Sequence, residues 1–100
     1  MTKLIALYKT PEDKESFDRQ YFEEHVPLVN KMPGLRKTEI SRLKSLGDVK
    51  YYLQAVMYFD DMDALNAAMA SPEGKASAKQ LMSFAKDLVI MYIGEDVTKS

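Results

Sequence analysis

Four short segments of the chain have the composition of β-strands. Residues 4–8 (LIALY) and 51–59 (YYLQAVMYF) are almost continuously apolar, which is typical of strands that are buried on both faces. Residues 35–43 alternate apolar with charged side chains, as an outer, half-exposed strand would. Residues 88–93 form the last apolar run, and we expect Gly94 to stop it. These segments are enough for one small sheet.

Two helical stretches separate the strands. The first runs over about residues 13–31, and its apolar side chains recur at helical spacing: Phe17, Tyr21, Leu28 and Met32. The second begins after Asp60 or Asp61, bends at Ser71-Pro72-Glu73, where a new N-cap precedes a proline, and ends near Lys86. The resulting order is βαββαβ. It predicts a ferredoxin-like α+β fold, in which two helices cover one face of a four-stranded antiparallel sheet.

Composition narrows the possible functions. One hundred residues, 46% of them apolar, predict a single domain over residues 1–100, with a flexible tail from about residue 95. Fourteen basic against fifteen acidic residues, without a basic cluster, argue against a nucleic-acid partner. One histidine and no cysteine leave no disulfide framework, no thiolate nucleophile and no transition-metal cage. No apolar span reaches 18 residues, so we expect no membrane segment and a cytoplasmic protein.

Both faces of the expected sheet are apolar. In the first, third and fourth strands, both sets of alternate positions carry apolar side chains, whereas a sheet with a wet face would alternate apolar with polar. Two helices can cover only one face. We therefore expect a homodimer in which a second copy covers the other face. The alternative is that tyrosines and alanines at the strand ends are merely half exposed.

His25 is the sharpest candidate for chemistry. It falls on the same broad stripe of the first helix as Phe17 and Tyr21, so we expect it to face the sheet. Pro27 cannot donate to the Glu23 carbonyl, and the helix should kink there. An imidazole titrates near neutral pH, so it can transfer protons there. One such group in an apolar pocket is typical of a site that binds a small molecule. The alternative is a core histidine whose nitrogens are satisfied by backbone or tyrosine.

The segment from Phe17 to Val29 (FDRQYFEEHVPLV) resembles the EthD family of dimeric α/β-barrel proteins. Its most specific piece is Tyr-x3-His-x-Pro-Leu, from Tyr21 to Leu28. Further pieces that resemble the family are residues 4–9 followed by Pro11, Met32-Pro33-Gly34-Leu35, Ser71-Pro72-Glu73-Gly74, and Phe84-Ala85. The resemblance implies a ferredoxin-like subunit whose sheet packs against a twin to form a barrel. It also implies a small-ligand pocket between helices and sheet within each subunit.

The resemblance also implies a site. Related dimeric barrels include cofactor-free monooxygenases, isomerases, cyclases and decarboxylases, so His25 would act as acid or base and Tyr21 as hydrogen-bond donor, without metal or cofactor. The implied substrate-binding residues are Ile5, Leu7, Phe22, Val29, Leu53, Met57, Ile90 and Tyr92. The expected ligand is a small apolar or aromatic metabolite. The alternatives are a non-catalytic binding or accessory protein of a degradation pathway, and a haem-handling barrel with His25 as sole nitrogen ligand.

Overall fold

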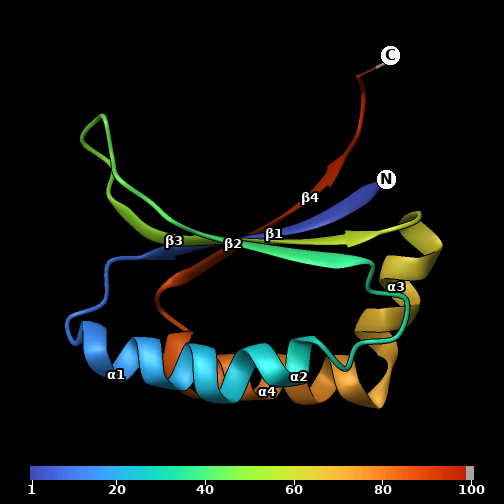
Figure 1. The fold of residues 1–100 in the computed structure, drawn as a ribbon, viewed down its shortest axis with the longest axis horizontal. Helices are drawn as coiled ribbons and strands as arrows, with labels where there is room; N and C mark the ends of the chain where they lie inside the picture. Colours follow the sequence, from blue (N-terminus) through green and yellow to red (C-terminus); the bar gives the residue numbers. More distant parts are fainter. Residues whose placement is uncertain (99–100) are drawn as a thin grey trace.

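The computed structural model describes residues 1–98, which form one twisted sheet with a layer of helices on one side (Figure 1). The strands are β1 (Thr2–Lys9), β2 (Lys37–Arg42), β3 (Tyr51–Phe59) and β4 (Val89–Glu95). The helical segments are α1 (Lys14–Arg19), a π-helical turn η1 (Gln20–His25), α2 (Val26–Val29), α3 (Met62–Ala70) and α4 (Pro72–Ala85). The sheet order is β2-β3-β1-β4, with antiparallel neighbours throughout. The predicted ferredoxin-like α+β arrangement is therefore confirmed.

The last strand is longer than predicted. β4 does not stop at Gly94 but continues to Glu95, and Gly94 pairs with Lys3 of β1. A Cβ atom at Gly94 would lie 3.2 Å from Cδ1 of Ile5, so the glycine leaves room for the Ile5 side chain instead of ending the strand.

The expected tail from about residue 95 falls at the end of the described chain. Asp96 forms ion pairs with the Met1 amino group, at 3.3 Å, and with Lys3 Nζ, at 2.8 Å. Lys99 and Ser100 lie outside the described residues. Within residues 1–98, no helix combines the length and the apolar character that crossing a bilayer requires.

Aspartate side chains cap the beginnings of α1 and α3, at Asp61 as the sequence predicts and also at Asp13. Asp13 accepts a hydrogen bond from the Ser16 amide at 3.0 Å, and Asp61 accepts one from the Ala64 amide at 2.8 Å. Each bond satisfies an amide that has no partner within its own helix. Asp13 and Asp61 thus fix the residues at which α1 and α3 begin.

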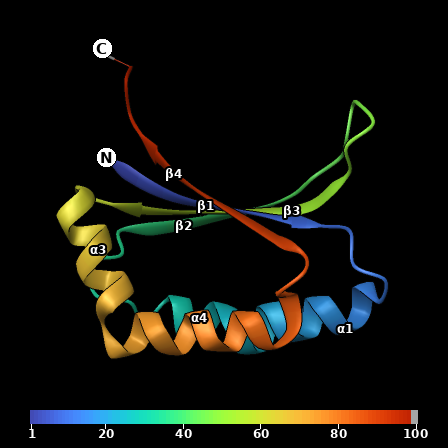
Figure 2. The ribbon, with the colours of Figure 1, turned by 180° about the vertical axis from the view of Figure 1, so that it is seen from behind.

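Ser71 and Gly74 make the sharp turn between α3 and α4. Ser71 Oγ donates to the Ala68 carbonyl at 2.6 Å and accepts from the Gly74 amide at 3.0 Å. A Cβ atom on Gly74 would lie 2.1 Å from the Ala68 carbonyl oxygen, so only glycine allows this close approach. As a result, α3 descends from the end of β3 and α4 runs back beneath the sheet (Figures 1 and 2).

The face of the sheet toward the helices forms the core. Register places Leu4 of β1 opposite Met57 of β3 and Ile93 of β4, so these three side chains share one face. The buried residues that the sheet contributes to this core are Leu4, Ala6, Tyr8, Leu53, Ala55, Met57 and Phe59.

The opposite face of the sheet, here called the open face, has no helix of the described chain over it (Figure 1). Its apolar residues gather on β1 and β4, with one on β3: Ile5, Leu7, Val56, Ile90 and Tyr92. Its polar residues gather on β2 and β3, with one at the start of β1: Lys3, Lys37, Glu39, Ser41, Gln54 and Tyr58. The open face is therefore divided into an apolar half and a polar half.

Candidate functional site

A π-helical turn places His25. The sequence predicts one helix over residues 13–31 that opens at Pro27, and the structure widens the turn immediately before this proline. The Val26 amide bonds to the Tyr21 carbonyl, five residues back, instead of to the residue four back. Turns of this kind are rare and frequently lie at functional sites. Pro27 has no amide hydrogen with which to continue the α-helical pattern from the Glu23 carbonyl.

The wide turn also changes which side chains face inward. At about 100° per residue, an unbroken α-helix would point Phe17 and Val29 about 120° apart, whereas absorbing one residue in η1 reduces the angle to about 20°. Phe17, His25 and Val29 are all buried, and Leu28 is only partly buried. The predicted inward stripe was therefore one residue out at Leu28, whereas its next member, Met32, is buried as predicted.

Gln80 of α4 holds the imidazole of His25. His25 is 5% exposed, and its Nδ1 lies 3.1 Å from Oε1 of Gln80. Because Oε1 is an acceptor, this contact requires the hydrogen on Nδ1 and leaves Nε2 with a free lone pair. The imidazole packs against the Tyr21 and Phe84 rings, with centroids 5.5 Å and 6.3 Å away. The histidine is thus fixed in position.

Burial lowers the pKa of His25, because the charged imidazolium loses its hydration, and the hydrogen bond to Gln80 opposes this shift only partly. His25 is therefore neutral at neutral pH. A neutral imidazole with an unprotonated Nε2 can accept a proton or a hydrogen bond.

A small apolar cavity lies beside His25, between the sheet and the helix layer. Its volume is about 60 Å³. The lining residues are Leu4, Ala6, Tyr8, His25, Val29, Met32, Met57, Met69, Ser77, Ala78, Leu81, Met82 and Met91. Only Tyr8, His25 and Ser77 carry polar side chains. The imidazole is therefore the one group of this lining whose ordinary pKa lies near neutral pH. We call this space the His25 cavity.

Three of the sequence-predicted site residues line the His25 cavity: His25, Val29 and Met57. Tyr21 and Leu53 are buried in the same core but lie outside the lining. Burial raises the pKa of Tyr21 to about 12, so its hydroxyl stays protonated at neutral pH. Tyr8, which the sequence did not single out, contributes the tyrosine ring of the cavity wall.

The remaining five predicted residues lie away from the His25 cavity. Ile5, Leu7, Ile90 and Tyr92 belong to the open face. The sequence predicts them on the cavity wall, and the strand register corrects this. Even-numbered residues of β1 pair with odd-numbered residues of β3 and β4, and these paired residues face the helices. Phe22 is 42% exposed. It follows Tyr21 in η1 and is therefore turned away from the core.

Several residues of the site were not found by sequence reasoning. Gln80, which holds His25, and the lining residues Ser77, Leu81, Met82 and Met91 are the main ones. The signal for α4 was available, because Ser77, Leu81 and Ala85 recur at intervals of four and are all buried. Met91 gives no such signal, since its face depends on the pairing of β4 with β1.

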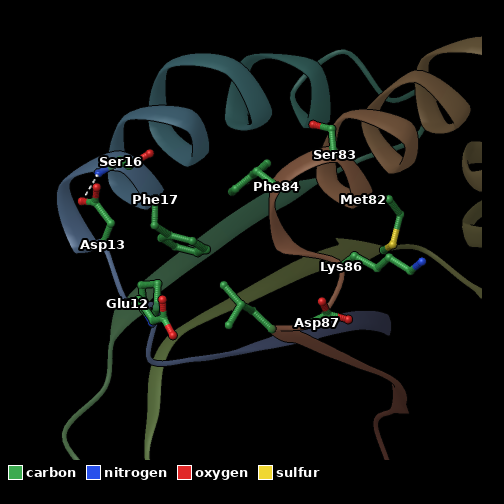
Figure 3. Close-up of a pocket in the computed structure, with 11 residues that line it drawn as sticks. Glu12, Asp13, Ser16, Phe17, Met82, Ser83, Phe84, Lys86 and Asp87 are labelled. Carbon is green, nitrogen blue, oxygen red and sulfur yellow. Dashed lines mark hydrogen bonds between the residues drawn. The ribbon is translucent and has the colours of Figure 1, made fainter.

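A larger open groove runs past the beginning of α1 and the end of α4 (Figure 3). It encloses about 510 Å³ and has a charged rim that includes Glu12, Lys86 and Asp87. Figure 3 shows Phe17 and Phe84 facing each other in this groove, with ring centroids 5.5 Å apart. Met82 borders both the groove and the His25 cavity. The two hollows therefore meet at this side chain.

Among residues 1–98, no group of three or more histidine, aspartate or glutamate side chains is close enough to hold a metal ion. The groove is larger than the His25 cavity, but its rim is open to solvent and lacks a histidine. The cavity joins an apolar lining to a fixed, neutral imidazole. We therefore take the His25 cavity as the candidate site.

Comparison with known proteins gives consistent matches. The pattern of the EthD domain matches residues 9–87. An uncharacterised 11.0 kDa protein from the thcB-thcC intergenic region of Rhodococcus erythropolis is 31% identical over 100 residues, covering 98% of this chain and 97% of its own. A crystal structure of an EthD family protein from Bacillus halodurans is 48% identical, with a TM-score of 0.91 over 97% of this chain and 99% of its own.

A more distant structure shares the fold alone. The crystal structure of a dimeric protein of unknown function with a ferredoxin-like fold, from Bacteroides fragilis, is 21% identical to this chain. Its TM-score is 0.65, and the match covers 95% of each chain.

Proposed function

The chain belongs to the EthD family, and from this premise we propose that it binds a small apolar or aromatic molecule in the His25 cavity. The observation that carries the proposal is a fixed, neutral imidazole in an otherwise almost wholly apolar cavity. Ligand sites commonly combine an apolar lining with a few well-placed polar groups. Here the polar groups are His25, Tyr8 and Ser77.

The proposed chemistry is proton transfer at His25. Nε2 takes a proton from an acidic O–H or C–H group of the bound molecule and returns it to another atom of the same molecule or to water. Gln80 supports this role, because its carbonyl oxygen accepts the Nδ1 hydrogen and continues to do so when the ring becomes charged. Such a deprotonation is also the first step of a cofactor-free oxidation in which O₂ is the oxidant.

Binding is tested with a panel of small phenols and aryl ketones. The chain has one histidine, so the imidazole signals in an NMR spectrum belong to His25 alone. We expect a ligand to move these signals and to protect the chain against thermal unfolding. If none of the panel moves them, ligand binding in this cavity is wrong.

Chemistry is tested separately with His25→Gln, which keeps a polar side chain of similar reach. If His25 is the acid or base, the variant should still bind the ligand but lose turnover by about 100-fold or more. Equal turnover in wild type and variant would contradict the catalytic role. Binding without turnover in both would favour the alternative, a non-catalytic binding or accessory protein.

We also propose that the chain forms a homodimer through its open face. Ile5, Leu7 and Ile90 lie side by side there, and Tyr92 at the edge is 54% exposed. A two-fold axis would bring the apolar half of one copy onto that of the other, which removes the patch from water. The Bacteroides fragilis protein of the same fold is described as dimeric. Such a dimer would close the sheet into the expected α/β barrel.

A further inference from the structure

Five of the seven methionines of the chain line the His25 cavity. They come from five different parts of the fold: Met32 follows α2, Met57 is in β3, Met69 in α3, Met82 in α4 and Met91 in β4. Side chains so far apart in the sequence share this space only because the fold brings them together. The lining is therefore rich in unbranched, flexible thioether side chains.

These five methionines form two groups. Met32 and Met57 are 5% and 6% exposed and make the inner wall of the cavity. Met69, Met82 and Met91 are 38%, 43% and 39% exposed, so they make its outer boundary; we call them the methionine rim. Ala78 of the lining is exposed as well. The rim joins the helix layer to β4.

The cavity is lined like a ligand pocket, but its volume is much smaller than that of a typical one. About 60 Å³ is far below the roughly 300–1,000 Å³ of typical ligand pockets. A ligand with more than a few heavy atoms therefore requires side chains to move. Methionine has three freely rotating bonds and adapts to irregular shapes more readily than branched residues do. Because Met82 also borders the 510 Å³ groove, its movement would extend the cavity toward the end of α4.

We propose that the methionine rim sets the size of ligand that the site accepts, by moving aside for ligands longer than the closed cavity. This inference rests on the proposed binding at His25. The ligand class is an apolar molecule with one hydroxyl group that donates to Nε2 of His25 and an alkyl or aryl extension that passes between Met69, Met82 and Met91. The extension leads along α4 toward the groove.

The test uses the whole chain with ¹³C-labelled methionine methyl groups and 4-alkylphenols from 4-methylphenol to 4-hexylphenol. The inner-wall signals of Met32 and Met57 and the three rim signals should move. Those of Met1 and Met62, which lie outside the lining, should stay and serve as internal references. In the wild type, affinity should rise about fourfold for each methylene that becomes buried.

The decisive variant replaces all three rim residues, Met69→Leu, Met82→Leu and Met91→Leu. Leucine keeps the volume but is branched and stiffer, and the exposed positions should tolerate it. All of these phenols exceed the closed cavity, but 4-methylphenol displaces the rim least, so its affinity should fall by no more than about twofold, while affinity for 4-hexylphenol should fall at least about tenfold. Met62→Leu is the matched control and should behave as the wild type. If the triple variant does not fold, Met82→Leu alone replaces it, with a smaller effect in the same direction.

The outcomes separate the two proposals. If the triple variant shows the same gain in affinity per methylene as the wild type, the rim does not determine ligand size, and the proposed binding at His25 stands. If no alkylphenol moves the signals of His25, Met32 or Met57, binding in the cavity is wrong and the rim proposal fails with it.

Discussion

Two effects shift the pKa of His25 in opposite directions. Burial lowers its pKa, and the hydrogen bond from Nδ1 to Gln80 raises it. Because burial is the larger effect, the site holds a neutral base without any charged partner within the cavity lining. The amide of Gln80 is uncharged, so it fixes the ring without fixing its protonation state. A substitution at position 80 should therefore shift the pKa of His25 without removing the larger effect of burial.

Two substitutions at Gln80 should move this pKa in opposite directions. Gln80→Leu removes the hydrogen bond and should lower the pKa of His25 further, whereas Gln80→Glu adds a negative charge and should raise it. The pH titration of the single imidazole by NMR measures both changes. A pKa that is equal in wild type and both variants would mean that Gln80 does not contact His25.

The same lowered pKa predicts how stability depends on pH. The unfolded chain takes up the histidine proton first as the pH falls, since its pKa is the ordinary one of about 6.5. The stability that neutral His25 contributes is thus complete above that pH and is lost as the pH falls through the folded value. Between about pH 7.5 and pH 5, wild type should lose more free energy of unfolding than His25→Gln. Urea unfolding at both pH values measures the difference, and equal losses would contradict it.

Among the elements, the turn between α3 and α4 depends most on a single residue. Gly74→Ala would improve helix propensity by about 1 kcal/mol, but its methyl group would meet the Ala68 carbonyl oxygen at 2.1 Å. Backbone must shift to relieve this contact, so we expect a net loss of about 1–2 kcal/mol in urea unfolding. Gly47→Ala is the control, because nothing lies within 4 Å of its added Cβ, and it should change stability by less than about 0.5 kcal/mol.

Elements with local signals could be predicted from the sequence, and their mutual register could not. β3 has the predicted bounds, and Asp61 and Ser71 cap helices as expected, because each signal lies within a few residues. Which face of β1 meets the helices depends on its pairing with β3, which no local pattern reveals. Ile5 was therefore placed in the cavity, although it lies on the open face.

On the scale of the whole molecule, the two faces of the sheet have different neighbours. One face packs on the helices and contains the His25 cavity, and the other is the open face. The resemblance to the EthD family that the sequence shows is confirmed by the matching domain pattern and the Bacillus halodurans structure. The proposed ligand binding and the proposed assembly use separate surfaces of one subunit.

The proposed dimer predicts a specific effect of Tyr92→Glu. The wild type should have the mass of two chains by light scattering at micromolar concentration, and a carboxylate buried without a partner in the contact should shift it to one chain. Leu46→Glu is the matched control, because Leu46 is fully exposed in the connection between β2 and β3, outside the open face. A wild type with the mass of one chain would contradict the dimer.

The widened turn η1 has a consequence for the length of the chain. A turn closed by the bond from Val26 to Tyr21 contains one residue more than an α-helical turn, and the excess is absorbed before α2 begins. Deleting exposed Glu23 or Glu24 would therefore keep the Phe17 and Val29 side chains pointing inward, in a helix that Pro27 still interrupts. Within the family, a protein one residue shorter at this place would keep the same buried face, and an alignment that ignores the turn would misassign every position from His25 to Met32.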